Sequence, residues 1–313
     1  MEAELKRQYF KILAEELVPA LGCTEPIAIA LASAKARDVL GVMPDRIVAK
    51  CSGNLVKNVK CVIVPNTDDL VGIEASAIMG AVGGDYSKGM EVLSGVTEDQ
   101  ILEANALYKK GVCSVELLDT PLNLHLIIEA YSGNDAAVVE VKNLHDNITF
   151  VSRNGETLYE SNERDGLYYG VLTDRSVLTF DRIYDFAETT PLDELKAVFK
   201  TQIEDNMAIA EEGLGGKYGV GIGAALIAND KSTFGKVKAY ASAASEARMS
   251  GCVLPVVTNS GSGNQGITAS VPVVVYAREK GIGEEKLYRA LAFSELLTVY
   301  QKTFIGRPSA FCG

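Results

Sequence analysis

The sequence CSVELLDTPLNLHLIIEAYSGNDAAVVEVKNLHDNITFVSRNG, residues 113–155, contains the clearest strand pattern of the chain. Four of its segments, CSVELL, LHLIIEAY, AAVVEVKN and NITFVSRNG, are rich in β-branched and apolar residues. The turn-forming stretches DTPLN, SGND and LHD separate them. Short apolar runs between turn residues are typical of strands, and short connections favour antiparallel neighbours. We therefore predict an antiparallel meander in the middle of the chain.

The segments on both sides of this meander are predicted to be helical. Residues 2–18 carry apolar side chains at helical spacing. A second helix is predicted from IAIALASAKARDVLG, with Pro26 in its first turn and Gly41 at its end. Three long helical stretches follow residue 180. In the last of them one apolar stripe contains Phe293, Leu296, Leu297, Tyr300 and Phe304.

The segment between the second helix and the meander is predicted to be mixed. In RIVAKCSGNLVKNVKCVIVPN, residues 46–66, β-branched runs flank SGN, which indicates a strand, a turn and a second strand. Cys51 and Cys61 lie within those runs, and we expect both to pack in the sheet. Residues 71–110 return to a helical pattern.

These elements predict an α+β protein. Residues 1–45 and 181–313 are expected to form one discontinuous, mainly helical catalytic domain. Residues 46–180 are expected to form an α/β middle domain with antiparallel strands. A length of 313 residues is enough for about two such domains.

Composition and charge exclude several classes of protein. Hydrophobic residues make up 47% of the chain and charged residues 23%, as in ordinary folded proteins. A net charge of −11 argues against nucleic-acid partners and anionic membrane surfaces. No apolar run reaches the ~20 residues of a membrane-spanning helix, and the N-terminus is charged. We expect a cytoplasmic protein with no membrane partner, and helices rich in small residues favour a homodimer.

The six cysteines include one in an unusual position. None forms a C-x-x-C pair, so we expect reduced thiols, most of them packed in the core. Cys23 instead follows Gly22 and precedes the predicted helix, where unpaired backbone N–H groups and the helix dipole favour a thiolate. A nucleophile, a metal ligand and simple packing beneath the helix all remain open for it.

A glycine-rich loop offers a binding site. TNSGSGNQGITAS, residues 258–270, lies directly before an apolar helical run, and backbone amides, hydroxyls and side-chain amides at a helix start suit a small carboxylate. The candidate binding residues are Ser260, Ser262, Asn264 and Gln265. An ordinary flexible turn is the alternative. The second glycine-rich stretch, residues 212–223, is expected to be structural.

The two histidines carry no hydrolase signature. His125 lies in a predicted strand and is expected to be structural, whereas His145 stands at a hairpin turn beside Asp146 and suits either turn hydrogen bonding or proton transfer. Neither G-x-S-x-G nor H-E-x-x-H is present, which argues against a triad hydrolase and a zinc peptidase.

Several motifs together resemble one known family. They occur in the order LGCTEP, CSGNLVKN, AVGGD, KNLHDN, TNSGSGNQG and RPSAFCG, and the resemblance covers essentially the whole chain. It is to the L-cysteine desulfidase family, which belongs with the α chain of iron–sulfur L-serine dehydratases.

The resemblance implies a lyase that uses no pyridoxal phosphate. Members of this family hold a [4Fe–4S] cluster with three cysteines and leave one iron open for substrate. They convert L-cysteine to pyruvate, ammonia and sulfide, or L-serine to pyruvate, ammonia and water. By motif position Cys23 and Cys312 match cluster cysteines, and Cys23, Thr24 and Glu25 form the catalytic motif. The family continues beyond the CG motif with another ligand, so we expect a C-terminally incomplete helical domain and no complete cluster in a truncated chain.

Three questions remain open at the level of sequence. The base that removes the Cα proton could be Glu25, His145 or a lysine. The substrate could be L-cysteine or L-serine, because the same metal chemistry serves both leaving groups. Outside this class, the chain could be a non-catalytic module that binds a small carboxylate and lacks the cluster, or a hydrolase with Cys23 as its nucleophile.

Overall fold

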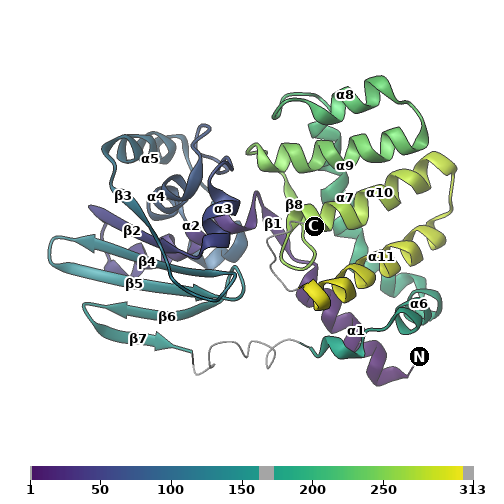
Figure 1. Ribbon diagram of the computed structural model, residues 1–313, viewed down its shortest axis with the longest axis horizontal. Helices are drawn as coiled ribbons and strands as arrows, with labels where there is room; N and C mark the ends of the chain where they lie inside the picture. Colours follow the sequence, from purple (N-terminus) through teal and green to yellow (C-terminus); the bar gives the residue numbers. More distant parts are fainter. Residues whose placement is uncertain (1, 162–172, 306–313) are drawn as a thin grey trace. The chain divides into compact units, whose positions relative to one another are not determined.

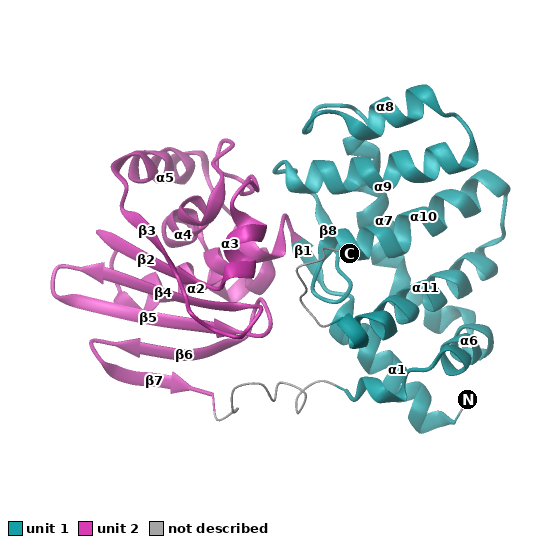
Figure 2. Ribbon diagram, viewed as in Figure 1, with its two compact units in different colours: residues 1–20, 168–313 teal, residues 21–167 magenta. Residues whose placement is uncertain are grey.

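The computed structural model describes residues 2–161 and 173–305, and the chain forms two compact units (Figure 2). The helical unit comprises residues 1–20 and 168–313, and the sheet unit comprises residues 21–167. The predicted α+β class is confirmed: a mixed sheet occupies the middle of the chain, with helical segments before and after it. The motif that contains Cys312 lies outside the described residues.

The sheet unit is built on six strands in the order β3-β2-β4-β5-β6-β7 (Figure 1). They are β2 (Arg46–Cys51), β3 (Cys113–Leu117), β4 (His125–Ser132), β5 (Asp135–Lys142), β6 (Ile148–Arg153) and β7 (Glu156–Glu160). Strands β4 to β7 pair antiparallel in sequence order. The predicted meander is therefore confirmed for these strands.

The prediction that β3 begins the meander is wrong. β3 pairs in parallel with β2, which lies between β3 and β4. A parallel pair needs a long crossover, and the chain between the two strands supplies one. It consists of α3 (Gly53–Val59), α4 (Gly72–Gly83), η1 (Tyr86–Glu91) and α5 (Glu98–Lys110).

The second strand predicted within residues 46–66 is a helix instead. Leu55 and Val59 are the buried residues of α3, and their spacing of four places them on one helical face. Cys51 is packed in β2 as predicted, whereas Cys61 is exposed beyond the end of α3. Burial raises the pKa of Cys51 and of Cys113 to about 12, so both remain neutral thiols that pack in the core.

Helices α2 (Thr24–Leu40) and α4 pack against each other and against the strands. Every residue from Ile27 to Ala34 is buried, because α2 contacts β4, β5 and α4 together. This packing places residues 21–45 in the sheet unit, whereas their helical pattern leads us to expect them in the helical domain. An alanine-rich segment without a polar face is suited to burial on several sides.

The helical unit contains seven α-helices in its described part (Figure 1). They are α1 (Ala3–Glu16), α6 (Phe180–Thr189), α7 (Leu192–Gly213), α8 (Ile222–Asn229), α9 (Thr233–Met249), α10 (Gly263–Lys280) and α11 (Glu284–Ile305). Helix α7 packs against α9, α10 and α11. The short turn η3 (Arg175–Val177) precedes α6, and β1 (Pro19–Leu21) pairs with β8 (Pro255–Val257).

Helix α1 joins this unit from the far end of the sequence. The rings of Tyr9 and Phe10 each lie 5.2 Å from the ring of Phe186, and the Tyr9 hydroxyl donates to the carbonyl oxygen of Val177 over 3.2 Å.

Among the described helices, none combines the length and the apolar character that crossing a bilayer requires.

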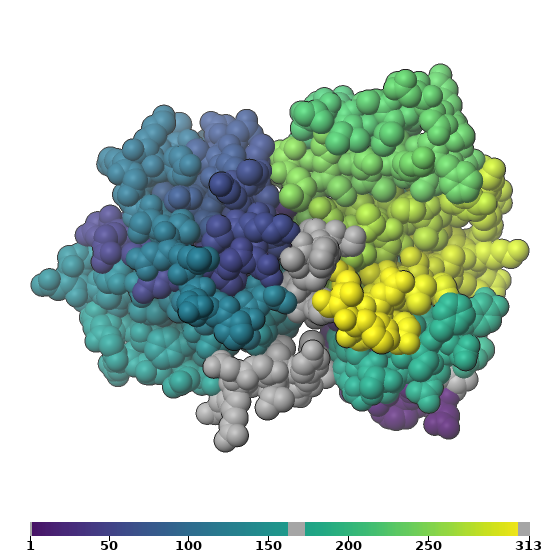
Figure 3. Space-filling model, viewed as in Figure 1, coloured from purple at the N-terminus to yellow at the C-terminus, as the bar shows by residue number. Residues whose placement is uncertain are grey.

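The buried stripe of α11 differs from the predicted one. It consists of Tyr288, Leu291, Ala292, Glu295, Leu296, Val299 and Lys302. Leu296 is buried as predicted, but Phe304 is 72% exposed at the end of the helix, where the space-filling view shows α11 at the surface (Figure 3). Two charged residues, Glu295 and Lys302, thus lie on the buried face of α11, and a search for apolar residues at helical spacing does not find them.

Candidate active site

Cys23 occupies the predicted position at the start of a helix. It is the N-cap residue of α2, its backbone is extended, and its side chain is buried. The carbonyl oxygen of Cys23 accepts the first hydrogen bond of the helix, from Ile27. Cys23 therefore stands at the positive end of the α2 dipole, next to the unpaired backbone N–H groups of the first helical turn.

Polar side chains from three segments meet at Glu25, in the first turn of the same helix. Thr24 Oγ1 donates to Glu25 Oε2 over 3.0 Å, and Asn58 Nδ2 of α3 donates to Glu25 Oε1 over 3.1 Å. His145 Nε2, from the β5–β6 turn, lies 4.0 Å from Glu25 Oε1. Two of the three candidate bases are thus neighbours, and a carboxylate beside an imidazole is a pair that can hold or move a proton.

The other histidine has the structural role that its strand predicts. His125 Nε2 lies 2.9 Å from Glu140 Oε1, and His125 Nδ1 lies 3.0 Å from Thr120 Oγ1. Burial alone would raise the pKa of Glu140, but hydrogen bonds from His125, Lys142 and Thr149 lower it to about 2. These contacts tie β4 to β5 and involve none of the candidate catalytic residues.

The glycine-rich loop opens α10 as predicted. Ser262 is the N-cap, and its hydroxyl accepts from the backbone N–H of Gln265 over 3.3 Å. Ser260 is buried with φ of 52°, a left-handed conformation that is uncommon for serine. Four backbone N–H groups here donate to no described residue, and we name them the open amides: Ser260, Gly261, Gly263 and Asn264.

A buried carboxyl on α11 supports this loop. Asn259 Nδ2 donates to Glu295 Oε2 over 2.6 Å and to the Glu295 carbonyl oxygen over 3.1 Å. Asn259 Oδ1 in turn accepts from the Ser260 hydroxyl over 2.7 Å. Glu295 Oε1 and both amide atoms of Gln202, on α7, are buried without a hydrogen-bond partner in the described structure. The hydrogen bonds that connect Glu295, Asn259 and Ser260 thus hold the glycine-rich loop against α11.

The charge state of Glu295 gives the first prediction. Burial raises its pKa to about 8, although the hydrogen bond from the Asn259 amide lowers it. A carboxyl that is protonated in the folded protein and ionised in the unfolded one stabilises most at low pH, and this contribution is lost as the pH rises through about 8. We expect the unfolding free energy to fall between pH 5 and pH 8, with a slope of at most about 1.4 kcal/mol per pH unit from this group.

Denaturant unfolding at several pH values measures this slope. Glu295→Gln should flatten it, because glutamine does not titrate. The matched control is Glu285→Gln, at an exposed site on the same helix, which should keep the wild-type slope. Equal slopes in Glu295→Gln and wild type would show that Glu295 is ionised in both states.

The second glycine-rich stretch is structural, as predicted, and its amides are occupied. Glu246, on α9, accepts hydrogen bonds from the backbone N–H groups of Val220, Gly221 and Ile222 over 2.7, 3.0 and 2.8 Å. These groups lie at the start of α8. The protein therefore supplies its own carboxylate to this helix start.

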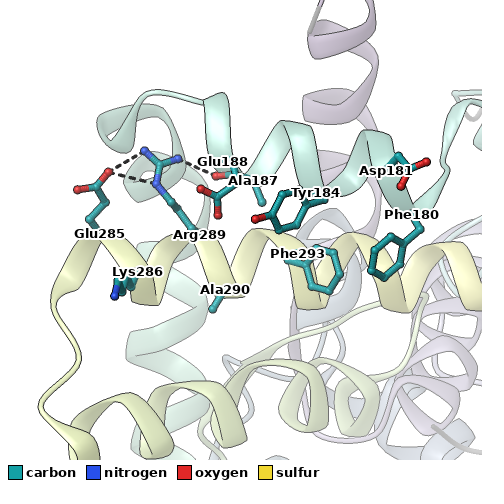
Figure 4. A pocket seen from close by; sticks show the side chains of 10 residues that line it. All are labelled: Phe180, Asp181, Tyr184, Ala187, Glu188, Glu285, Lys286, Arg289, Ala290 and Phe293. Carbon is teal, nitrogen blue, oxygen red and sulfur yellow. Dashed lines mark hydrogen bonds and ion pairs between the residues drawn. The ribbon is translucent and has the colours of Figure 1, made fainter.

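A cavity of about 770 Å³ lies between α6 and α11 (Figure 4). Its aromatic side chains contact one another, with the rings of Phe180 and Phe293 5.4 Å apart. Its arginine, Arg289, is fully engaged, donating to the Ala187 carbonyl oxygen over 2.7 Å and to Glu285 over 2.8 Å. None of the candidate site residues lines this cavity.

The described residues fit one cluster ligand at most. Cys23 is a buried thiol at a helix start, but Cys51 and Cys113 are held neutral and Cys61 is exposed. Within residues 2–161 and 173–305, no group of three metal-ligating side chains converges. Cys312, the other expected ligand, lies outside these ranges.

The structure distributes the candidate residues over both units. Cys23, Thr24 and Glu25 lie in the sheet unit, and Ser260, Ser262, Asn264 and Gln265 lie in the helical unit. Sequence reasoning missed Asn259, Glu295 and the buried Arg248. The sequence does contain a signal for Glu295: it lies four residues before the apolar Val299 and seven after Tyr288, which is the spacing of residues on one helical face.

Comparison with known proteins identifies relatives along the whole chain. The serine dehydratase alpha chain family matches residues 87–313. A UPF0597 protein of Treponema denticola is 47% identical over 312 residues, which cover 98% of this chain and 72% of the relative. UPF0597 proteins of Fusobacterium nucleatum and Lachnoclostridium phytofermentans are 44% and 45% identical, over 100% and 98% of this chain and 74% and 73% of their own.

No solved structure matches the chain. The family match spans more than half of the sequence, and the relatives align over nearly all of it. The chain therefore belongs to the UPF0597 family and carries a serine dehydratase alpha chain domain.

Proposed function

We propose that this protein is an iron–sulfur lyase that catalyses β-elimination from L-cysteine without pyridoxal phosphate, giving pyruvate, ammonia and sulfide. The match of residues 87–313 to the serine dehydratase alpha chain family carries this proposal. The substrate follows from the resemblance of the LGCTEP and TNSGSGNQG motifs to L-cysteine desulfidases. We further propose that Cys23 and Cys312 are cluster ligands.

The chemistry requires three contributions. β-Elimination removes a weakly acidic Cα proton and expels a poor leaving group, and a bound cluster with an open iron supplies the Lewis acid for that group. The chain must then orient the amino acid and accept its proton. Ser260, Ser262, Asn264 and Gln265 are the proposed contacts to the substrate carboxylate, and the neighbouring Glu25 and His145 are the proposed acceptors of the proton.

L-Serine is the second candidate substrate, because the matching family is named for serine dehydratase. The two reactions differ in the leaving atom, sulfur or oxygen, and the residues proposed above would contact only the parts that both substrates share. The same assay therefore has to offer both amino acids.

The decisive experiment is an anaerobic purification followed by two assays. Iron and acid-labile sulfide are quantified first, and pyruvate formation is then measured with L-cysteine and with L-serine separately. We expect a coloured protein that forms pyruvate and sulfide from L-cysteine. If pyruvate forms from L-serine alone, the substrate is L-serine and not L-cysteine. If the protein contains no iron and binds amino acids without converting them, it is a binding module.

A further inference from the structure

A buried arginine lies beside the open amides. Arg248, near the end of α9, is 3% exposed. Its Nη1 donates to Asn264 Oδ1 over 3.0 Å, and its Nε has no hydrogen-bond partner in the described structure. A Cβ on Gly263 would lie 2.2 Å from Arg248 Nε, so the guanidinium lies directly against the first residue of α10.

No carboxylate of the described residues forms an ion pair with Arg248. A buried cation without a counterion is costly, and proteins keep such a group where an anion joins it. The four open amides add the positive end of the α10 dipole at the same place. Both features favour the same kind of ligand, a small anion with two oxygens.

The protein contains an internal precedent for this chemistry. At the start of α8 a similar set of backbone N–H groups binds a carboxylate, that of Glu246. Glu246 and Arg248 lie two residues apart on α9, so side chains of this helix contact the starts of both α8 and α10. The start of α8 contacts the Glu246 carboxylate, and the start of α10 contacts the Arg248 guanidinium. A carboxylate at the start of α10 would therefore have to come from a ligand.

We propose that Arg248 and the open amides form the subsite for the α-carboxylate of the amino acid substrate. This inference rests on the proposed function, because it takes the ligand to be an amino acid. The guanidinium offers planar donors that match the two oxygens of a carboxylate, and Asn264 holds it in place. Amino acids would then be selected over amines of the same shape.

Binding of L-alanine tests the subsite without turnover. L-Alanine has the carboxylate and amine of the substrates but no β leaving group, and ethylamine is its counterpart without the carboxylate. Calorimetry on the full chain should show binding of L-alanine and none of ethylamine. Arg248→Met should weaken L-alanine binding roughly 10- to 100-fold, as expected for a charge-assisted hydrogen bond.

Two further variants make the test specific. Arg248→Lys keeps the charge but loses the planar fork, so it should bind with intermediate affinity, and it is the informative variant if Arg248→Met does not fold. The control is Arg278→Met, at an exposed site on α10, which should bind like wild type.

The outcomes separate this inference from the lyase proposal. Equal L-alanine affinity in wild type and Arg248→Lys, binding of ethylamine as tight as that of L-alanine, or no binding of L-alanine by wild type would each overturn the subsite. Binding that depends on Arg248 in a protein that forms no pyruvate would support the subsite and refute the lyase.

Discussion

Replacing Cys23 with alanine is expected to abolish pyruvate formation and to lower the iron content of the purified protein. The thiolate is the form of cysteine that binds iron, and Cys23 is the buried thiol at the start of α2. A Lewis-acid metal supplies several kcal/mol of transition-state stabilisation. Its loss corresponds to a rate at least roughly a thousandfold lower, because each 1.36 kcal/mol is a factor of ten.

The control for Cys23→Ala is a second cysteine substitution. Cys61 is exposed and lies outside the candidate site, so Cys61→Ala should keep both iron and activity. Iron and pyruvate are measured on anaerobic protein, and thermal unfolding is followed by circular dichroism to confirm folding. Full activity in a folded Cys23→Ala variant would remove Cys23 from the mechanism.

Replacing Gly80 with alanine is expected to destabilise the protein strongly, although it adds only a single methyl group. Gly80 lies on α4 where this helix crosses α2, and an added Cβ would lie 2.2 Å from the carbonyl oxygen of Ala30 and 2.5 Å from its Cα. Backbone atoms cannot rotate away, so the two helices must separate. Overpacking of this kind costs about 1–3 kcal/mol or more, which exceeds the ~1 kcal/mol that alanine gains over glycine in a helix.

The matched control is Gly53→Ala. Gly53 begins α3, and a Cβ there would meet no atom within 4 Å. Its substitution should change the unfolding free energy by less than about 0.5 kcal/mol. Denaturant unfolding monitored by circular dichroism compares the two variants. Equal stability of Gly80→Ala and Gly53→Ala would mean that α2 and α4 are not in close contact in solution.

Local patterns predicted the elements better than their partners. Pro26 lies in the first turn of α2 and Gly41 ends it, as predicted, because these signals act within a few residues. The position of β2 between β3 and β4 depends on pairing across a long crossover, which no local pattern specifies. The same limit applies to α2, whose alanines suit any close packing partner.

The parts of the candidate site that depend on local turn and helix-capping residues could be predicted from the sequence. The start of α10 and the N-cap position of Cys23 follow from turn and capping residues, and the structure has both. Glu295 and Arg248 were not identified, because charged residues in helices normally face solvent. Each forms a hydrogen bond with an asparagine that is distant in sequence: Glu295 with Asn259, in the loop before α10, and Arg248 with Asn264, in the first turn of α10.

The discontinuous helical unit has a consequence for synthesis on the ribosome. Tyr9 and its partner Val177 are separated by 168 residues, so α1 emerges long before α6 exists. At translation rates of about 5–20 residues per second, the apolar face of α1 waits roughly 10 to 30 s for its partners. The sheet unit, whose residues are continuous in sequence, can fold during that interval, whereas the apolar face of α1 stays without the helices that bury it.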